Sequence, residues 1–132
     1  MDIVINGKRI SVSGKGIVVS NNVVYVDGEE VANADKEKIE IYGDVGSVQS
    51  DRSVTVRNGE IHGNVEAKGS VNCCNVRGNV RADGSVNCNN VQQFVNAGGS
   101  INCDDIGGDA HAGGSISCDD IKGNASAKVI SR

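Results

Sequence analysis

The chain has no proline and no tryptophan, and its only aromatic residues are Tyr25, Tyr42 and Phe94. A proline would remove a backbone donor from any strand that pairs on both sides, so its absence permits long stacks of strands. Proteins that bind single-stranded nucleic acid stack bases on exposed aromatic side chains, and three aromatics cannot provide such a platform. The composition therefore favours a β-rich chain and argues against a binder of single strands.

Clustered positive charge is also missing, and 13 Lys and Arg against 17 Asp and Glu give a net charge of −4. Nucleic-acid binding depends on a basic footprint, so we expect no nucleic-acid partner. No apolar run is long enough to span a membrane, and the first residues, MDIVINGKRI, lack the n-region and h-region of a signal peptide. We therefore expect no transmembrane segment, and a cytoplasmic location or a place in a virion or similar assembly.

Repetition dominates the second half of the chain, where four cysteines follow one another at intervals of fifteen residues. The repeats are GSVNCCNVRGNVRAD from Gly69, GSVNCNNVQQFVNAG from Gly84, GSINCDDIGGDAHAG from Gly99 and GSISCDDIKGNASAK from Gly114. A fixed short period is typical of one supersecondary unit stacked on copies of itself. The segment Ser53–Val56 matches Ser70–Cys73, with two extra residues in the turn that follows it.

Within each repeat, valine, isoleucine, cysteine and alanine occupy alternate positions in runs too short for helices, separated by Gly, Asn and Asp. This pattern predicts short strands joined by tight turns. Three strands per fifteen residues predict a three-sided parallel β-helix, whose coils are about 4.8 Å apart. The handedness of parallel crossovers favours a right-handed winding. We place this array at residues 38–132.

Residues 1–37 follow a different pattern. Val-rich and Ile-rich runs are separated by Asn6-Gly7, Asn21-Asn22 and Asp27-Gly28, which are typical of two-residue hairpin loops. These runs predict a small antiparallel β-meander that caps the first coil of the array. The charged run Asp35–Lys38 marks the expected junction.

The segments GNVEAKGSV, GNVRADGSV and GNASAK, which start at Gly63, Gly78 and Gly123, carry a resemblance to known families. They resemble the repeats of bactofilins, the polymer-forming cytoskeletal proteins of bacteria, and of β-helical putative adhesin domains. The resemblance extends over residues 41–128 and implies a right-handed parallel β-helix without catalytic residues. The regular fifteen-residue coil and the cysteine repeat depart from the family pattern.

The repeated cysteines Cys73, Cys88, Cys103 and Cys118 are expected to form a ladder of buried, reduced thiols. Four residues stacked at about 4.8 Å form a line, so they cannot converge on one metal ion. Parallel Cβ directions also oppose disulfides between neighbouring coils. The odd count, with Cys74 left over at a corner, together with the absence of an export signal, favours reduced thiols.

Stacked acidic pairs occur at one corner, where Asp104-Asp105 and Asp119-Asp120 replace the asparagines of earlier coils. Stacked carboxylates repel one another unless they are solvated or neutralised by a cation, and calcium binds such oxygen ligands. Asp and Asn also tolerate left-handed turn geometry, which explains the same residues without a metal. Calcium is therefore one of two interpretations, and no other cofactor is expected.

Contact residues are expected at two places. Phe94 falls at an outward phase, where it either contacts a partner or tucks into a rearranged corner. At the C-terminal end, Ile116, Val129 and Ile130 are expected to form an interface, because an uncovered last coil exposes its interior and its unpaired backbone.

The function expected from these features is that of a non-enzymatic structural or assembly protein, since no nucleophile, base and acid share a face. It would form a homo-oligomer, or dock onto a larger protein assembly, through the end or a face of the β-helix. The alternative is an adhesin-like or phage-structural binding module that recognises a carbohydrate or protein surface, with or without calcium.

Overall fold

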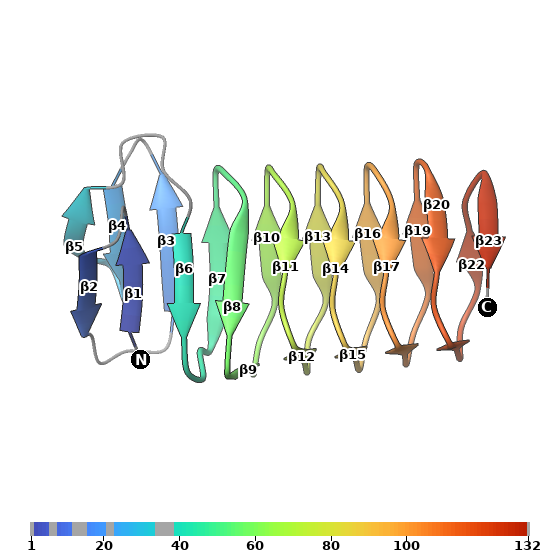
Figure 1. The fold of residues 1–132 in the computed structure, drawn as a ribbon, viewed down its shortest axis with the longest axis horizontal. Helices are drawn as coiled ribbons and strands as arrows, with labels where there is room; N and C mark the ends of the chain where they lie inside the picture. Colours follow the sequence, from blue (N-terminus) through green and yellow to red (C-terminus); the bar gives the residue numbers. More distant parts are fainter. Residues whose placement is uncertain (1, 6–7, 12–15, 21–22, 34–38, 132) are drawn as a thin grey trace.

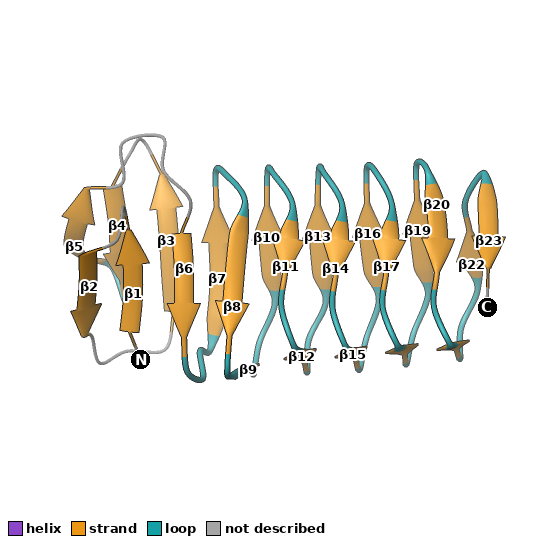
Figure 2. Ribbon diagram, viewed as in Figure 1, coloured by secondary structure: helices purple, strands orange, loops and turns teal. Residues whose placement is uncertain are grey.

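The computed structural model describes residues 2–5, 8–11, 16–20, 23–33 and 39–131, and these form strands, turns and bends without a helix (Figure 2). The strands stand side by side along one long axis, and the chain advances along it from β7 to its C-terminal end (Figure 1). About six coils of about fifteen residues follow one another, so the fold is a β-solenoid. The expected all-β, three-sided parallel architecture is confirmed.

Three sheets make the three sides of the solenoid. Sheet A contains, in spatial order, β2 (Lys8–Ser11), β1 (Asp2–Ile5), β6 (Ile39–Tyr42), β8 (Val54–Arg57), β11 (Val71–Asn72), β14 (Val86–Asn87), β17 (Ile101–Asn102), β20 (Ser115–Ser117) and β23 (Val129–Ser131).

Sheet B contains, in the opposite order, β22 (Ala125–Ser126), β19 (Ala110–Ala112), β16 (Val95–Ala97), β13 (Val80–Ala82), β10 (Val65–Ala67), β7 (Ser47–Ser50), β3 (Gly16–Ser20), β4 (Val23–Val26) and β5 (Glu29–Asn33). Sheet C contains β21 (Asp120–Ile121), β18 (Asp105–Ile106), β15 (Asn90–Val91), β12 (Asn75–Val76) and β9 (Glu60–Ile61).

Equivalent residues of successive coils pair directly, which explains the fifteen-residue period. On sheet A, Val71 pairs with Val86, and Val86 pairs with Ile101. Each strand thus uses its backbone donors and acceptors on both neighbours, in parallel register. Side chains of one phase stack into ladders, and the inward phase is the apolar phase.

The interior is a narrow column of buried aliphatic side chains. Sheet B contributes two stacked rows of buried side chains. One row consists of valines, with Ala110 in place of valine in a later coil, and the other consists of alanines from Ala67 to Ala112. Sheets A and C contribute rows of valine and isoleucine, of which Ile101, Ile106 and Ile116 are each 1% exposed. The small alanine side chains let the three sheets approach one another, so no aromatic residue is needed to fill the column.

The N-terminal strands prolong two of the three sheets. Strands β1 and β2 form an antiparallel hairpin that extends sheet A, where β1 also pairs antiparallel with β6. Strands β3, β4 and β5 form an antiparallel meander that extends sheet B. Strand β3 joins this meander to the sheet, because it also pairs in parallel with β7. The antiparallel N-terminal strands are therefore confirmed, and they are shared between two sheets.

The turn between β4 and β5 has the geometry that its sequence predicts. Asp27 has φ of 50° and Gly28 has φ of 84°, and two consecutive positive φ angles are typical of a type I′ turn. The loops expected at Asn6-Gly7 and Asn21-Asn22, and the junction at residues 35–38, lie outside the described residues.

One corner of the solenoid is longer than the others. Ser70 lies 17 residues after its partner Ser53, whereas Ser85 lies 15 residues after Ser70. The extra residues belong to the turn between β8 and β9, where Asn58 has a positive φ of 57°. Strand β8 therefore continues to Arg57, while β11 of the next coil ends at Asn72. This longer corner shapes the groove described below.

Among the described residues, none belongs to a helix long and apolar enough to cross a membrane.

Candidate functional site

The C-terminal coil offers open strand edges and exposed apolar side chains. Among the described strands, β21, β22 and β23 each have a partner on one side only. Val129 is 63% exposed and Ile130 is 41% exposed, although both belong to a strand of sheet A. This end, formed by β21, β22 and β23, is called the terminal coil below (Figure 1).

Strand β23 covers part of the interior that we expected to be open. Ile130 pairs with Ile116, and the backbone N–H of Cys118 donates to the carbonyl oxygen of Ser131 at 3.0 Å. Ile116 is therefore only 1% exposed. The prediction that Ile116 is accessible at the interface is wrong, because β23 adds another rung to sheet A. Val129 and Ile130 themselves lie at the surface.

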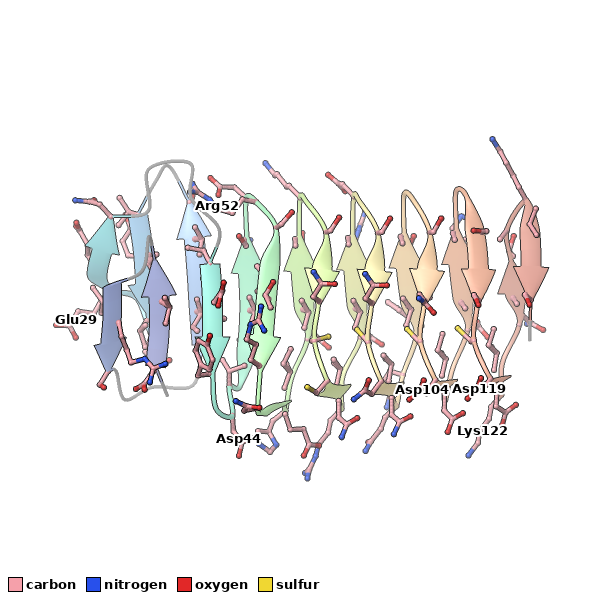
Figure 3. The ribbon with its side chains drawn as sticks, viewed as in Figure 1. Glu29, Asp44, Arg52, Asp104, Asp119 and Lys122 are labelled. Carbon is pink, nitrogen blue, oxygen red and sulfur yellow. The ribbon has the colours of Figure 1, made fainter. Side chains whose placement is uncertain are left out.

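The opposite end of the solenoid is charged. Its edge strands are β2, with the sequence KRIS, and β5, with the sequence EEVAN. Glu29 projects at this end in Figure 3, and Glu30 is also exposed. Arg9 on β2 lies 3.6 Å from the Asp2 carboxylate and 5.0 Å from the Tyr42 ring centre. Charged side chains on edge strands discourage further pairing, so the two ends differ in kind.

Phe94 is an exposed aromatic in a ladder of polar side chains. At the equivalent positions, the side-chain oxygen of Asn64 accepts from the N–H of Asn79, and that of Asp109 accepts from the N–H of Asn124. The N–H of Phe94 donates to Asn79 Oδ1 at 3.2 Å, but a phenyl ring cannot accept from the next coil. The ring is 43% exposed, so the alternative in which it tucks into the corner is wrong.

The cysteine row lies along the corner between sheets A and C, where the sulfur atoms follow one another in Figure 3. All five cysteines are free thiols. Cys88, Cys103 and Cys118 are buried, whereas Cys73 and Cys74 are only half-buried. The prediction that Cys73 is buried like the other three cysteines of the row is wrong. The coil before Cys73 contains the longer corner after β8, and this corner leaves the Cys73 side chain partly exposed.

A shallow groove of about 820 Å³ runs along this corner. The longer corner supplies Arg57 and Asn58 to the groove, which continues past them to Glu40 and Tyr42 of β6, and the cysteine row lines it from Cys73 to Cys103. Its outer wall is a row of exposed asparagines on sheet A, of which Asn87 Nδ2 donates to Asn72 Oδ1 at 2.9 Å. The complete lining is Glu40, Tyr42, Thr55, Val56, Arg57, Asn58, Asn72, Cys73, Cys74, Asn87, Cys88, Asn89, Asn102, Cys103 and Asp104.

The first two thiols of the row are in contact. Cys73 Sγ lies 2.7 Å from Cys88 Sγ. Rotation about the Cα–Cβ bond turns these two sulfurs toward each other although their residues are stacked, and both remain free thiols.

The buried thiols resist ionisation. The pKa of Cys103 is raised by its hydrogen bond to Cys88 and by burial, and burial raises the pKa of Cys118 to about 11. At Cys88 a hydrogen bond with Cys103 lowers the pKa, but the hydrogen bond with Cys73 and burial raise it by more, so the net pKa is raised. Since the thiolate is the reactive form, these three thiols are protected at neutral pH.

The four aspartates expected at a cation corner are exposed and stacked in pairs. The N–H of Asp119 donates to the carbonyl oxygen of Asp104 at 2.7 Å, and Asp105 pairs in register with Asp120. Figure 3 shows Asp104 and Asp119 side by side at the edge of the solenoid. Over the described ranges, no three His, Cys, Asp or Glu side chains are arranged to hold a metal ion.

A second, smaller hollow of about 280 Å³ lies beside these aspartates on sheet C. It forms where Gly107 has no side chain between Gln92 and Lys122, which occupy the same position in neighbouring coils. Asp105 and Asp120 line it as well, so the hollow carries charges of both signs.

Sequence reasoning missed the asparagine wall and the groove. Asn72, Asn87 and Asn102 repeat at the same interval as the cysteines, so their outward phase was readable from the period. The two extra residues after Val56 were also visible in the sequence. Their consequence, that Arg57 and Asn58 line the groove, depends on the direction in which that corner turns.

Comparison of the chain with protein families, with curated proteins and with solved structures finds no match.

Proposed function

We propose that this chain is a non-enzymatic structural protein that associates with a second copy of itself through the terminal coil. The observation that carries the proposal is the contrast between the two ends. The terminal coil exposes Val129 and Ile130 beside unpaired strand edges, whereas the edge strands of the opposite end carry Arg9, Glu29 and Glu30. An apolar, unpaired edge favours pairing, and a charged edge opposes it.

The same contrast favours a closed pair over a filament. A head-to-tail filament needs each terminal coil to pair with the charged N-terminal end of the next copy. A two-fold contact instead joins two identical apolar ends, and β23 would then pair antiparallel with its own copy. This architecture is compatible with a distant bactofilin-like or adhesin-like origin, in which a β-helix serves as a building block and not as a catalyst.

The wider arrangement supports a structural role. Short turns join the strands of successive coils, and the hollow along the cysteine row is a shallow groove and not a deep cleft. The two histidines lie apart, since His111 belongs to β19 on sheet B and His62 follows β9 on sheet C. An acid-base pair must lie within hydrogen-bond reach of the same reacting group, so the separation of the two histidines supports a structural role.

The experiment is light scattering coupled to size-exclusion chromatography, at micromolar and high micromolar concentrations. We expect a dimer for the unaltered chain, and a shift to monomer for Ile130→Lys, which places a charge on the exposed edge strand. Val18→Lys is the matched control, because Val18 is 37% exposed on β3, far from the terminal coil (Figure 1). A monomer at high micromolar concentration for the unaltered chain contradicts the proposal.

A second candidate is a binding module that recognises a carbohydrate or a protein surface. The asparagine wall favours it, because Asn72, Asn87 and Asn102 present amide donors and acceptors at the regular spacing of the coils, about 4.8 Å. Phe94 supplies an exposed ring on another edge of the solenoid. Repeating the chromatography with calcium, and screening immobilised glycans with an Asn87→Ala variant as control, separates this candidate from the first.

A further inference from the structure

We propose that Cys73 and Cys88 form a reversible disulfide that joins two adjacent coils, made by exchange with a small-molecule disulfide such as oxidised glutathione that enters through the groove. This inference does not depend on the proposed dimer. It concerns the corner between sheets A and C, and the terminal coil lies at the end of the solenoid.

The first argument is reach. The two residues occupy equivalent positions of neighbouring coils, and the N–H of Cys73 donates to the carbonyl oxygen of Asn87, the residue before Cys88, at 2.9 Å. Parallel strands place such residues about 4.8 Å apart, within the Cα separation of disulfides, 4.4–6.8 Å. Their sulfurs already lie 2.7 Å apart, so a bond needs only a small side-chain movement.

The second argument is access. Cys73 is half-buried and lines the groove of about 820 Å³, beside Arg57 and Asn58 of the longer corner. A reagent therefore reaches Cys73 without opening a coil. Cys103 and Cys118 have the same stacking geometry, but they are 5% and 6% exposed and lie farther from the longer corner. The structure thus distinguishes one pair in a row of four similar thiols.

The exchange balances in two steps. The Cys73 thiol loses its proton to water, and its thiolate attacks one sulfur of oxidised glutathione, which forms a mixed disulfide and releases one glutathione thiolate. The Cys88 thiol then loses its proton and attacks the Cys73 sulfur, which releases the second glutathione. Two protein thiols are oxidised, and one molecule of oxidised glutathione is reduced to two of glutathione.

The different burial of Cys73 and Cys88 also predicts the relative rates of the two steps. Cys73 makes the first attack because it is the accessible thiol, and this step is fast compared with the reaction of the buried thiols. Cys88 resolves the mixed disulfide slowly, because burial still raises its pKa after Cys73 has reacted and leaves little thiolate at neutral pH. Glutathionylated protein should therefore appear before the internal disulfide, and the second step should accelerate as the pH rises from 7 to 9.

The test is to incubate the native chain with oxidised glutathione, alkylate the remaining thiols and measure masses over time. We expect a transient adduct of one glutathione, followed by a product that has lost two hydrogens. Fragmentation of the cross-linked peptide from the unaltered chain should place the bond between Cys73 and Cys88, and dithiothreitol should reverse it.

Variants make the assignment independent of the peptide map. Cys88→Ala should stop the reaction at the glutathione adduct. Cys103→Ala is the matched control, because it removes a buried thiol of the next coil and should still form the internal disulfide. Circular dichroism of each variant checks that it is folded. Cys74 lies next to Cys73, so Cys74→Ser should retain the product. A bond mapped to Cys73–Cys74, no loss of hydrogens in the native chain, or the same disulfide product from Cys88→Ala overturns the proposal.

Discussion

Truncation of one interior side chain should destabilise the solenoid far more than truncation of an exposed aliphatic side chain on β3. Ile106 lies on β18 and is 1% exposed, with Val91 below it and Ile121 above it in the same ladder. Ile106→Ala removes about three carbon atoms, which costs about 2.4 kcal/mol in transfer free energy alone.

A cavity term adds to this cost. Val91 and Ile121 cannot collapse into the space, because backbone hydrogen bonds hold their strands about 4.8 Å from β18 on either side. The total should therefore be about 3–4 kcal/mol, in the middle of the range measured for such substitutions. Ile106→Val leaves a smaller hole and should cost about 1 kcal/mol.

Urea unfolding followed by circular dichroism measures both variants, with the free energy of unfolding obtained by linear extrapolation. Val18→Ala is the matched control, since Val18 is 37% exposed on β3, away from the terminal coil, and should cost less than about 1 kcal/mol. Equal costs for Ile106→Ala and Val18→Ala would refute the assignment of an inward phase to Ile106 and an outer position to Val18.

Three further predictions concern a turn, a thiol and a pair of carboxylates. Gly28→Ala should lower the free energy of unfolding by about 1 kcal/mol because φ is positive there, and Gly28→Asn should lower it less. Burial raises the pKa of Cys118 to about 11, so the folded state holds this proton more tightly than the unfolded chain. Stability should therefore fall as the pH rises from about 8.5 towards 11, and less steeply in Cys118→Ala, as thermal melts at several pH values would show. Asp120→Asn should raise the free energy of unfolding by roughly 0.2–1 kcal/mol at low salt, because it removes the repulsion between Asp120 and Asp105, and high salt should abolish the gain. A higher midpoint of thermal unfolding at low salt alone would show this.

The repeat allowed most of the fold to be predicted from the sequence. A fifteen-residue period fixes which residues stack, and the inward phase follows from the alternation of apolar and polar residues. The structure pairs Val71 with Val86 and Asn72 with Asn87, in the register that the period predicts. Local chemistry was equally informative at Asp27-Gly28, whose two positive φ angles match the expected hairpin turn.

The placement of the N-terminal strands was beyond reach of the sequence. Turn residues identify a hairpin, but they do not say which existing sheet it extends. The pairing of β1 with β6 and of β3 with β7 depends on contacts between strands far apart in the chain. The contact between the Cys73 and Cys88 sulfurs was missed for a similar reason, because the period determines Cβ directions and leaves χ1 free.

The candidate features lie on separate parts of a one-dimensional molecule. Each coil of a solenoid contacts only its neighbours, so a bond between Cys73 and Cys88 stabilises the coils it joins and reaches the terminal coil only through the coils between them. Ile130 pairs with Ile116, more than one coil beyond Cys88. A disulfide in the middle of the solenoid therefore makes no contact with the edge that is proposed to join a second copy. Oxidation should stabilise the corner between sheets A and C at Cys73 and Cys88. It should leave the association equilibrium of the terminal coil unchanged, because disulfide formation and association involve no common contact.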